Sequence, residues 1–167
     1  PSSAVSADPV STPGETQPDA QPAAFPADYT LDPNREMPSA QIGAIRYIGI
    51  LEIPSLSLSL PIADDWQNGN FYLTPCRYTG SPYTDDHVDL GHNYASQFRA
   101  LTGIAPGAAV TFTDLDGNVF SYTVSDTEIL PPDAVEEMVT GDWDLTVFTC
   151  TIGGQNRLAV RCVRADA

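Results

Sequence analysis

The stretch VTFTDLDGNVFSYTV, residues 110–124, decides the fold class of this chain. Apolar and polar residues alternate on both sides of a central DLDGN, which is the pattern of two half-buried β-strands. An Asp-Gly pair between two such runs is a strong signal for a β-hairpin. The stretch therefore predicts a hairpin with strands over residues 110–113 and 119–124.

The turn of this hairpin also resembles the beginning of a calcium-binding loop. An EF-hand loop requires glycine at its sixth position and glutamate at its twelfth. Counted from Asp114, Gly117 is the fourth residue and Ser125 is the twelfth. We therefore interpret the segment as a hairpin turn, and we expect the protein to hold no metal and no cofactor.

Further strand patterns lie on both sides of the hairpin. Residues 47–53 are rich in β-branched and aromatic residues and stop at Pro54, and residues 55–60 read SLSLSL, which predicts a strand with three leucines on one face. Residues 145–150 and 157–163 form a last pair around two glycines, and short helices are expected over 95–101 and 133–138. Six to eight short strands with few helices predict an all-β fold, a closed or nearly closed β-barrel.

The N-terminal part differs from the rest in composition. The first 40 residues hold 8 of the 15 prolines, together with many serines and alanines. Such a segment buries too little apolar surface to offset its chain entropy. We therefore expect residues 1–44 to be an extended stalk or linker and residues 45–167 to be the folded domain.

The charge excludes several classes of partner. The chain has 22 acidic residues against 7 basic ones, all of them arginine, and a formal net charge of −15. Nucleic acids and anionic lipid surfaces attract basic proteins, so neither is an expected partner. The sequence also has no apolar run of about 18 residues, the length that spans a bilayer.

The chain has three cysteines, Cys76, Cys150 and Cys162. An odd number leaves two options within one chain: a disulfide plus one free thiol, or three free thiols. The absence of a Cys-x-x-Cys spacing and the presence of only two histidines argue against a zinc site.

Cys150 is the candidate nucleophile. It ends a predicted strand, and Arg157 begins the next one, so a hairpin would bring the guanidinium near the thiol. A fixed cation favours the thiolate and can also hold an oxyanion. The alternative is that Cys150 is a small buried hydrophobe, the commonest role of a single cysteine. Arg161 and Arg164 follow on the same strand, so positive charge is expected to gather beside Cys150.

His92 is the candidate acid and base. It ends the run VDLGHN, residues 88–93, and is expected to share a strand face with Val88 and Leu90. His87 follows a polar turn, and we expect it to be exposed and uninvolved in chemistry.

Together these motifs resemble the sortase family. The matching features are the Gly91-His92-Asn93 strand end, the Thr146-x-x-Thr149-Cys150 strand end and Arg157. The opening Ile48-Gly49-x-Leu51-x-Ile53-Pro54, the leucine strand that follows it and the hairpin of residues 107–122 are also similar. The resemblance covers about residues 45–164 in matching order.

The resemblance implies an eight-stranded β-barrel and a cysteine transpeptidase, a thiol protease-type enzyme of the Gram-positive cell surface. Cys150 would attack the Thr–Gly carbonyl of an LPxTG-like sorting signal to give a thioacyl enzyme. His92 would protonate the leaving amine and deprotonate the incoming one, and Arg157 would position the substrate and stabilise the oxyanion. Asn93 and Thr149 would contact the substrate.

The resemblance leaves open the acceptor, the catalytic competence and the sortase class. The acceptor would be an amine of a cell-wall precursor or, in a pilin polymerase, a lysine of another protein; a catalytically silent binding module is a further alternative. Asn93 is similar to the class B pattern, while Asp32-Pro33 resembles the start of a class C lid. By the resemblance, the membrane is reached only through an anchor, which we expect before Pro1.

Overall fold

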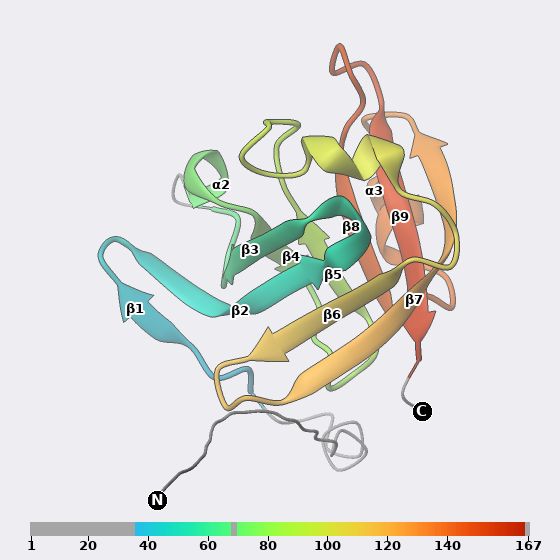
Figure 1. Cartoon of the computed structure of the whole chain (residues 1–167). Coiled ribbons are helices and arrows are strands. Elements are labelled where there is room, and N and C mark those ends of the chain that lie inside the picture. The colour runs from blue at the N-terminus through green and yellow to red at the C-terminus, as the bar shows by residue number, and fades with distance from the viewer. Residues whose placement is uncertain (1–35, 68–69, 166–167) are drawn as a thin grey trace, which may run out of the picture.

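A computed structural model describes residues 36–67 and 70–165 of the chain (Figure 1). Within these ranges the chain forms nine strands, three of which have an end at Cys150 or beside it: β5 (His87–Leu90), β8 (Leu145–Cys150) and β9 (Arg157–Arg164). The other strands are β1 (Ala40–Ile42), β2 (Ile45–Ile53), β3 (Leu58–Ala63), β4 (Cys76–Thr79), β6 (Ala109–Asp114) and β7 (Val119–Leu130). The helical elements are α2 (Asn70–Leu73), α3 (Val135–Val139) and the 3₁₀ turns η2 (Pro54–Leu56) and η3 (Arg99–Gly103).

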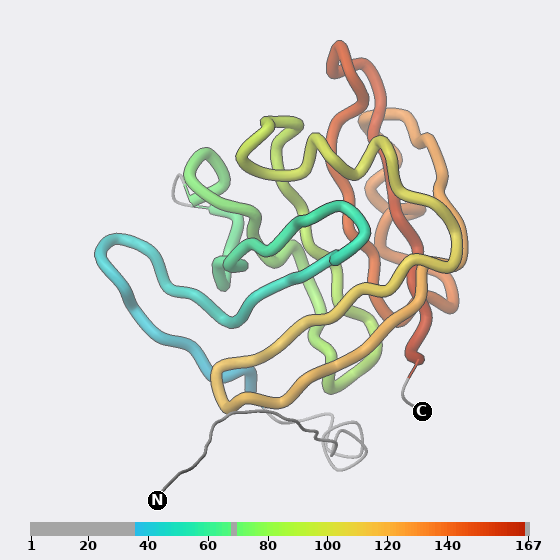
Figure 2. The backbone as a smooth tube through the Cα atoms, viewed as in Figure 1, coloured from blue at the N-terminus to red at the C-terminus, as the bar shows by residue number. Residues whose placement is uncertain are grey.

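Eight of the strands close into a barrel. The order is β2-β3-β4-β5-β8-β9-β7-β6, and β6 pairs back onto β2 through Gly49↔Asp114 to Glu52↔Thr111. The pairs β3–β4 and β5–β8 are parallel, and the remaining neighbours in the ring are antiparallel. The closed barrel is the expected fold class, and Figure 2 shows the path of the backbone through it in the same view.

β1 lies outside the ring as a ninth strand on the edge of β2. It pairs Ala40 with Tyr47 and Ile42 with Ile45, and Met37 packs against the barrel core. The folded part of the chain thus includes residues before position 45, where we placed the start of the domain. Most of the expected stalk, and the Asp32-Pro33 pair, lie outside the described residues.

The barrel interior is filled by apolar side chains from β2, β3, β6, β7, β8 and β9. Ile48, Leu51, Phe112, Phe120 and Val147 are among the side chains that are fully buried there. Alternating strands with one face inward account for this pattern, as in β7, whose first six residues alternate between half-buried and buried. The alternation predicted for residues 110–124 is therefore correct.

Two predicted elements differ from the structure. The expected strand over residues 55–60 begins only at Leu58, because Ser57 takes a left-handed conformation with φ of 53° and ends the η2 turn. The expected helix over 95–101 is replaced by turns and η3. The second expected helix is present as α3, shifted to Val135–Val139.

Candidate active site

Adjacent strands bring His92, Cys150 and Arg157 to one end of the barrel. In the parallel β5–β8 ladder Leu90 pairs with Phe148, so His92 and Cys150, each two residues further on, reach the same level. In the antiparallel β8–β9 ladder Cys150 pairs directly with Arg157. The three candidate residues thus lie side by side across β5, β8 and β9, which run together in Figure 1.

Cys150 is half-buried and borders two pockets. The first, here called the apolar pocket, has a volume of about 220 Å³ and contains Arg157 but not His92. The second, here called the His92 pocket, has a volume of about 440 Å³ and contains His92 but not Arg157. The thiol of Cys150 therefore lies between the pocket that contains the Arg157 guanidinium and the pocket that contains the His92 imidazole.

The apolar pocket is lined by residues of α2 and α3, of the strands β4, β5, β8 and β9, and of adjoining loops. Aromatic and aliphatic side chains dominate its wall, and Phe148 meets Tyr78 edge to face with ring centroids 5.7 Å apart. The lining residues are Trp66, Phe71, Tyr78, Leu90, Gly91, Pro131, Pro132, Ala134, Val135, Met138, Phe148, Thr149, Cys150 and Arg157. In the part of the chain that the structure describes, no aspartate or glutamate lines it, so Arg157 is its one charged lining residue.

Arg157 is oriented by the backbone of the β8–β9 loop. Its Nη1 group donates to the carbonyl of Asn156 at 3.1 Å and to that of Gly154 at 3.4 Å. Neither acceptor is charged, so the guanidinium keeps its full positive charge at the mouth of the apolar pocket. A cation held in this way opposite a thiol can stabilise an oxyanion that forms there.

His92 is enclosed by aromatic rings. Its imidazole stacks on Phe71 of α2, with centroids 3.7 Å apart, and on Tyr94, with centroids 4.6 Å apart. Tyr72 stacks further out at 5.2 Å. This burial lowers the pKa of His92 below its ordinary value of 6.5. The imidazole is therefore mainly neutral at pH 7, the state that can accept a proton.

The buried Nε2 atom of His92 has no hydrogen-bond partner within residues 36–67 and 70–165. The same holds for the hydroxyl of Thr149, a residue only 1% exposed on the wall of the apolar pocket. Buried polar atoms normally have a partner, so these two atoms are exceptions, and both belong to residues that line the pockets at Cys150.

Gln97 is a site residue that sequence reasoning did not find. Its side chain is 3% exposed; its Oε1 accepts a bond of 2.8 Å from the backbone N–H of His92, and its Nε2 donates to the carbonyl of Phe71 at 3.4 Å. It therefore ties α2 to the end of β5 and fixes the stack. A lone glutamine in a loop gives no sequence signal for this role.

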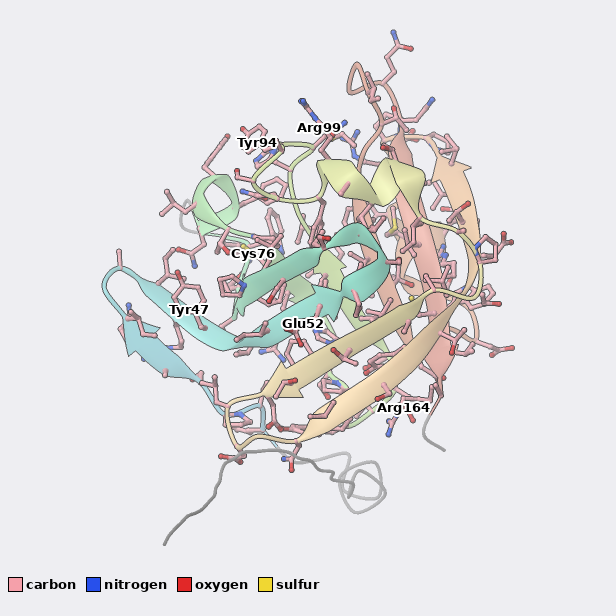
Figure 3. All side chains as sticks on the ribbon, viewed as in Figure 1. Tyr47, Glu52, Cys76, Tyr94, Arg99 and Arg164 are labelled. Atoms are coloured by element: carbon pink, nitrogen blue, oxygen red, sulfur yellow. The ribbon has the colours of Figure 1, made fainter. Side chains whose placement is uncertain are left out.

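Asn93 faces away from the apolar pocket, onto the wall of the His92 pocket. Its Oδ1 and its backbone carbonyl accept bonds of 3.4 Å and 3.2 Å from the guanidinium of Arg99. Asn93 thus holds a second arginine beside the site, one that the sequence analysis did not single out. Figure 3 shows Arg99 next to Tyr94 in the segment after β5.

The structure corrects the expectation for His87. It is fully buried, not exposed, and its Nε2 lies 2.8 Å from Oδ1 of Asp89, which is also fully buried. His87 meets Phe112 edge to face inside the barrel, with centroids 4.9 Å apart. All four residues of β5 are buried, so a polar turn before the strand was a poor guide to exposure.

The three cysteines are free thiols. Cys76 and Cys162 are fully buried, and burial raises the pKa of each thiol to about 12. They are therefore protonated and shielded, whereas Cys150 opens onto both pockets. The odd cysteine count is explained by three free thiols and not by a disulfide.

Positive charge does not gather beside Cys150 as far as expected. Arg161 is 1% exposed and bonds beneath α3, to the carbonyls of Met138 and Glu137 at 2.7 Å each. Arg164 is at the far end of β9, where its Nη1 lies 2.9 Å from Oδ1 of Asp85. Of the three arginines on β9, Arg157 alone lines a pocket next to the cysteine.

No group of three or more metal-ligating side chains occurs in the described ranges, 36–67 and 70–165. Within the same ranges, none of the helices is long and apolar enough to cross a membrane.

The fold and the site define a closed β-barrel protein with a cysteine, a histidine and an arginine on neighbouring strand ends. The family model described as the sortase domain matches residues 51–165. The chain belongs to the sortase family. No curated protein matches the sequence at a significant level.

Solved structures of sortases have the same fold. Sortase C1 from Streptococcus suis aligns with a TM-score of 0.64 at 24% identity, covering 72% of this chain and 74% of that one. Sortase C1 from Streptococcus agalactiae gives 0.67 at 23% identity, covering 83% and 76%. Sortase A from Corynebacterium diphtheriae gives 0.65 at 21% identity, covering 84% and 68%.

Proposed function

We propose that this chain is a cysteine transpeptidase that cleaves an LPxTG-like sorting signal between Thr and Gly and passes the acyl part to an amine. The observation that carries the proposal is the position of Cys150 between two pockets, with Arg157 in one and His92 in the other. Acyl transfer needs a nucleophile, an oxyanion stabiliser and an acid-base group that all reach one carbonyl. The three strand ends supply these groups.

In the first half-reaction the sulfur of Cys150 attacks the threonine carbonyl. Neutral His92 takes the thiol proton, and Arg157 stabilises the negative charge that develops on the carbonyl oxygen. The C–N bond to glycine then breaks, His92 gives its proton to the leaving amine, and a thioester remains on Cys150. The lowered pKa of His92 suits this cycle, because the resting imidazole is free to accept the proton.

In the second half-reaction an acceptor amine attacks the thioester. His92 removes a proton from this amine as the new C–N bond forms, and the C–S bond breaks. The proton returns to the departing thiolate of Cys150, which restores the starting state. The amine enters where the first amine left, so both occupy the side of Cys150 on which His92 lies.

The apolar pocket fits the acyl part of the signal. A leucine and a proline match its aromatic and aliphatic wall, which lacks acidic residues. Thr149 lines this pocket, and we expect it to contact the peptide there. Asn93 lies in the other pocket, so its contact would be with the amine side of the reaction.

Sortases are extracytoplasmic, membrane-associated enzymes, and this chain would work at the cell surface. The acceptor in the main proposal is an amine of the cell-wall precursor. The alternative is a pilin polymerase, which joins subunits through a lysine amine. We retain this alternative because sortase C1 structures are among the structural neighbours of this chain. A catalytically silent binding module is opposed by the joint presence of His92, Cys150 and Arg157.

Intact-mass measurement tests the proposal. The protein is incubated with a panel of LPxTG-like peptides, and the expected product carries one peptide acyl group on Cys150, released by hydroxylamine. Cys150→Ala should form no adduct, while Cys76→Ala should still form one. The proposal fails if no peptide in a broad panel gives an adduct, or if the adduct persists in Cys150→Ala.

A further inference from the structure

The His92 pocket contains a cation that the proposed chemistry does not use. Arg99 lines this pocket together with His92, Asn93 and Cys150. Among residues 36–67 and 70–165, no aspartate or glutamate lines it, although acidic residues outnumber basic ones by 22 to 7 in the chain. The local charge of the pocket is therefore positive in a strongly negative protein.

Arg99 is both anchored and available. Its Nε and Nη2 atoms donate to Asn93, at 3.4 Å to the side chain and 3.2 Å to the backbone carbonyl. Among residues 36–67 and 70–165, no carboxylate forms an ion pair with it, and its Nη1 group makes no hydrogen bond. An oriented guanidinium with unused N–H groups is suited to bind a carboxylate.

The position of this cation relates it to the acceptor amine. An amine that attacks the thioester must reach both Cys150 and His92. Both residues line the His92 pocket, whereas the apolar pocket is lined by Cys150 but not by His92. An acceptor seated in the His92 pocket would therefore also border Arg99. A carboxylate a few bonds from the reacting amine could meet the guanidinium while the amine faces the thioester.

We propose that Arg99 is a specificity residue that selects an acceptor amine with a neighbouring carboxylate, as in a diamino acid of the cell wall, over an isolated lysine-type amine. This inference rests on the proposed transpeptidase function. The overall charge of −15 opposes an anionic acceptor, but charges beyond about 8–10 Å are largely screened at physiological salt. Arg99 thus acts as a local contact and not as a source of long-range attraction.

The test uses the thioacyl enzyme formed on Cys150 from an LPxTG-like peptide. Transfer to diaminopimelate, to its bis-amide and to Nα-acetyl-lysine amide is measured as kcat/KM in wild type, Arg99→Ala and Arg99→Gln. The acid and its amide differ in amine basicity, but this difference is the same for every protein, so it cancels when the acid-to-amide ratio of a variant is divided by that of wild type. Arg46→Ala is the matched control, since Arg46 is exposed and lines neither pocket at Cys150.

Wild type should favour diaminopimelate over its bis-amide and over the lysine derivative. Both Arg99 variants should lower the acid-to-amide ratio about fivefold, the upper range for an exposed ion pair. Arg46→Ala should keep the wild-type ratio, and raising the salt should lower it in wild type. An unchanged acid-to-amide ratio in both Arg99 variants, or a wild-type preference for the lysine derivative, overturns the inference about Arg99. In either case an adduct on Cys150 still supports the proposed transpeptidase function. Absence of any adduct overturns both.

Discussion

The imidazole of His92 stacks on the ring of Phe71, with centroids 3.7 Å apart. Phe71 belongs to α2, so a short helix far from β5 in the sequence controls the surroundings of the candidate acid-base group. Burial beneath this ring lowers the pKa of His92. The protonation of the site therefore depends on a contact between two separate segments.

Removing the ring should reverse this effect. In Phe71→Ala the pKa of His92 should rise toward 6.5, because water regains access to the charged imidazolium. NMR titration of the imidazole protons measures it, and Tyr72→Ala should give a smaller change because Tyr72 is 70% exposed and stacks at 5.2 Å. A pKa that is the same in Phe71→Ala and wild type would contradict the burial explanation.

The same shift has a consequence for stability. Because the pKa of His92 is lower in the folded protein, the unfolded chain binds more protons as the pH falls below about 6.5. The contribution of His92 to the free energy of unfolding is thus present above that pH and is lost as the pH falls through the folded pKa. Phe71→Ala should flatten this part of the pH profile.

Arg161 should be the most costly arginine to replace. Its guanidinium is buried and bonds to Glu128 at 3.1 Å, to Thr146 at 3.0 Å and to two carbonyls of α3, and the helix forms part of the apolar pocket. Arg161→Met leaves these partners unpaired and should lower the free energy of unfolding by about 1–3 kcal/mol, the cost of buried polar groups left without their hydrogen bonds. Urea denaturation measures this loss.

Arg46→Met provides the comparison, because Arg46 is exposed and its guanidinium bonds only to Ser39 among the described residues. Its free energy of unfolding should stay within about 0.5 kcal/mol of wild type. Equal losses in the two variants would show that Arg161 does not act through its buried bonds. Arg161→Met should also weaken sorting-peptide binding more than it slows alkylation of Cys150 by a small reagent.

Local pattern was enough to predict the barrel and the strand ends. The Asp-Gly hairpin and the alternation around it are properties of neighbouring residues, and the pairing of Cys150 with Arg157 follows from one short hairpin. The position of His92 at the end of β5 was also visible in the sequence. The roles of these residues remain proposals.

What failed depends on tertiary packing that the local sequence pattern does not show. His87 was expected to be exposed, but β5 is covered on both sides by the core, which no polar turn reveals. Phe71, Gln97 and Arg99 reach the site from loops and a short helix whose placement no periodicity predicts. The structure places these loop residues, and they shape the surroundings of the candidate site.

Gly91, the residue before His92, should tolerate no side chain. A Cβ at this position would lie 2.5 Å from the ring of Phe98, which is fully buried. Gly91→Ala should therefore displace Phe98 and lower the free energy of unfolding by about 1–3 kcal/mol. At Gly103 a Cβ would meet nothing within 4 Å, so Gly103→Ala should be close to neutral. Thermal and urea unfolding of both variants compare the two sites, and equal stability would refute the packing argument.

The thiols should differ sharply in reactivity. Alkylation requires the thiolate, and burial raises the pKa of Cys76 and Cys162 to about 12, so both are protonated at pH 8 as well as shielded. Iodoacetamide at pH 8 should therefore modify one thiol per native chain, Cys150, and three after unfolding in urea. Mass spectrometry counts the modified thiols, and Cys150→Ala should take up none in the native state. Native labelling of Cys76 or Cys162 at the rate of Cys150 would show that the barrel opens at these positions and that burial does not protect them.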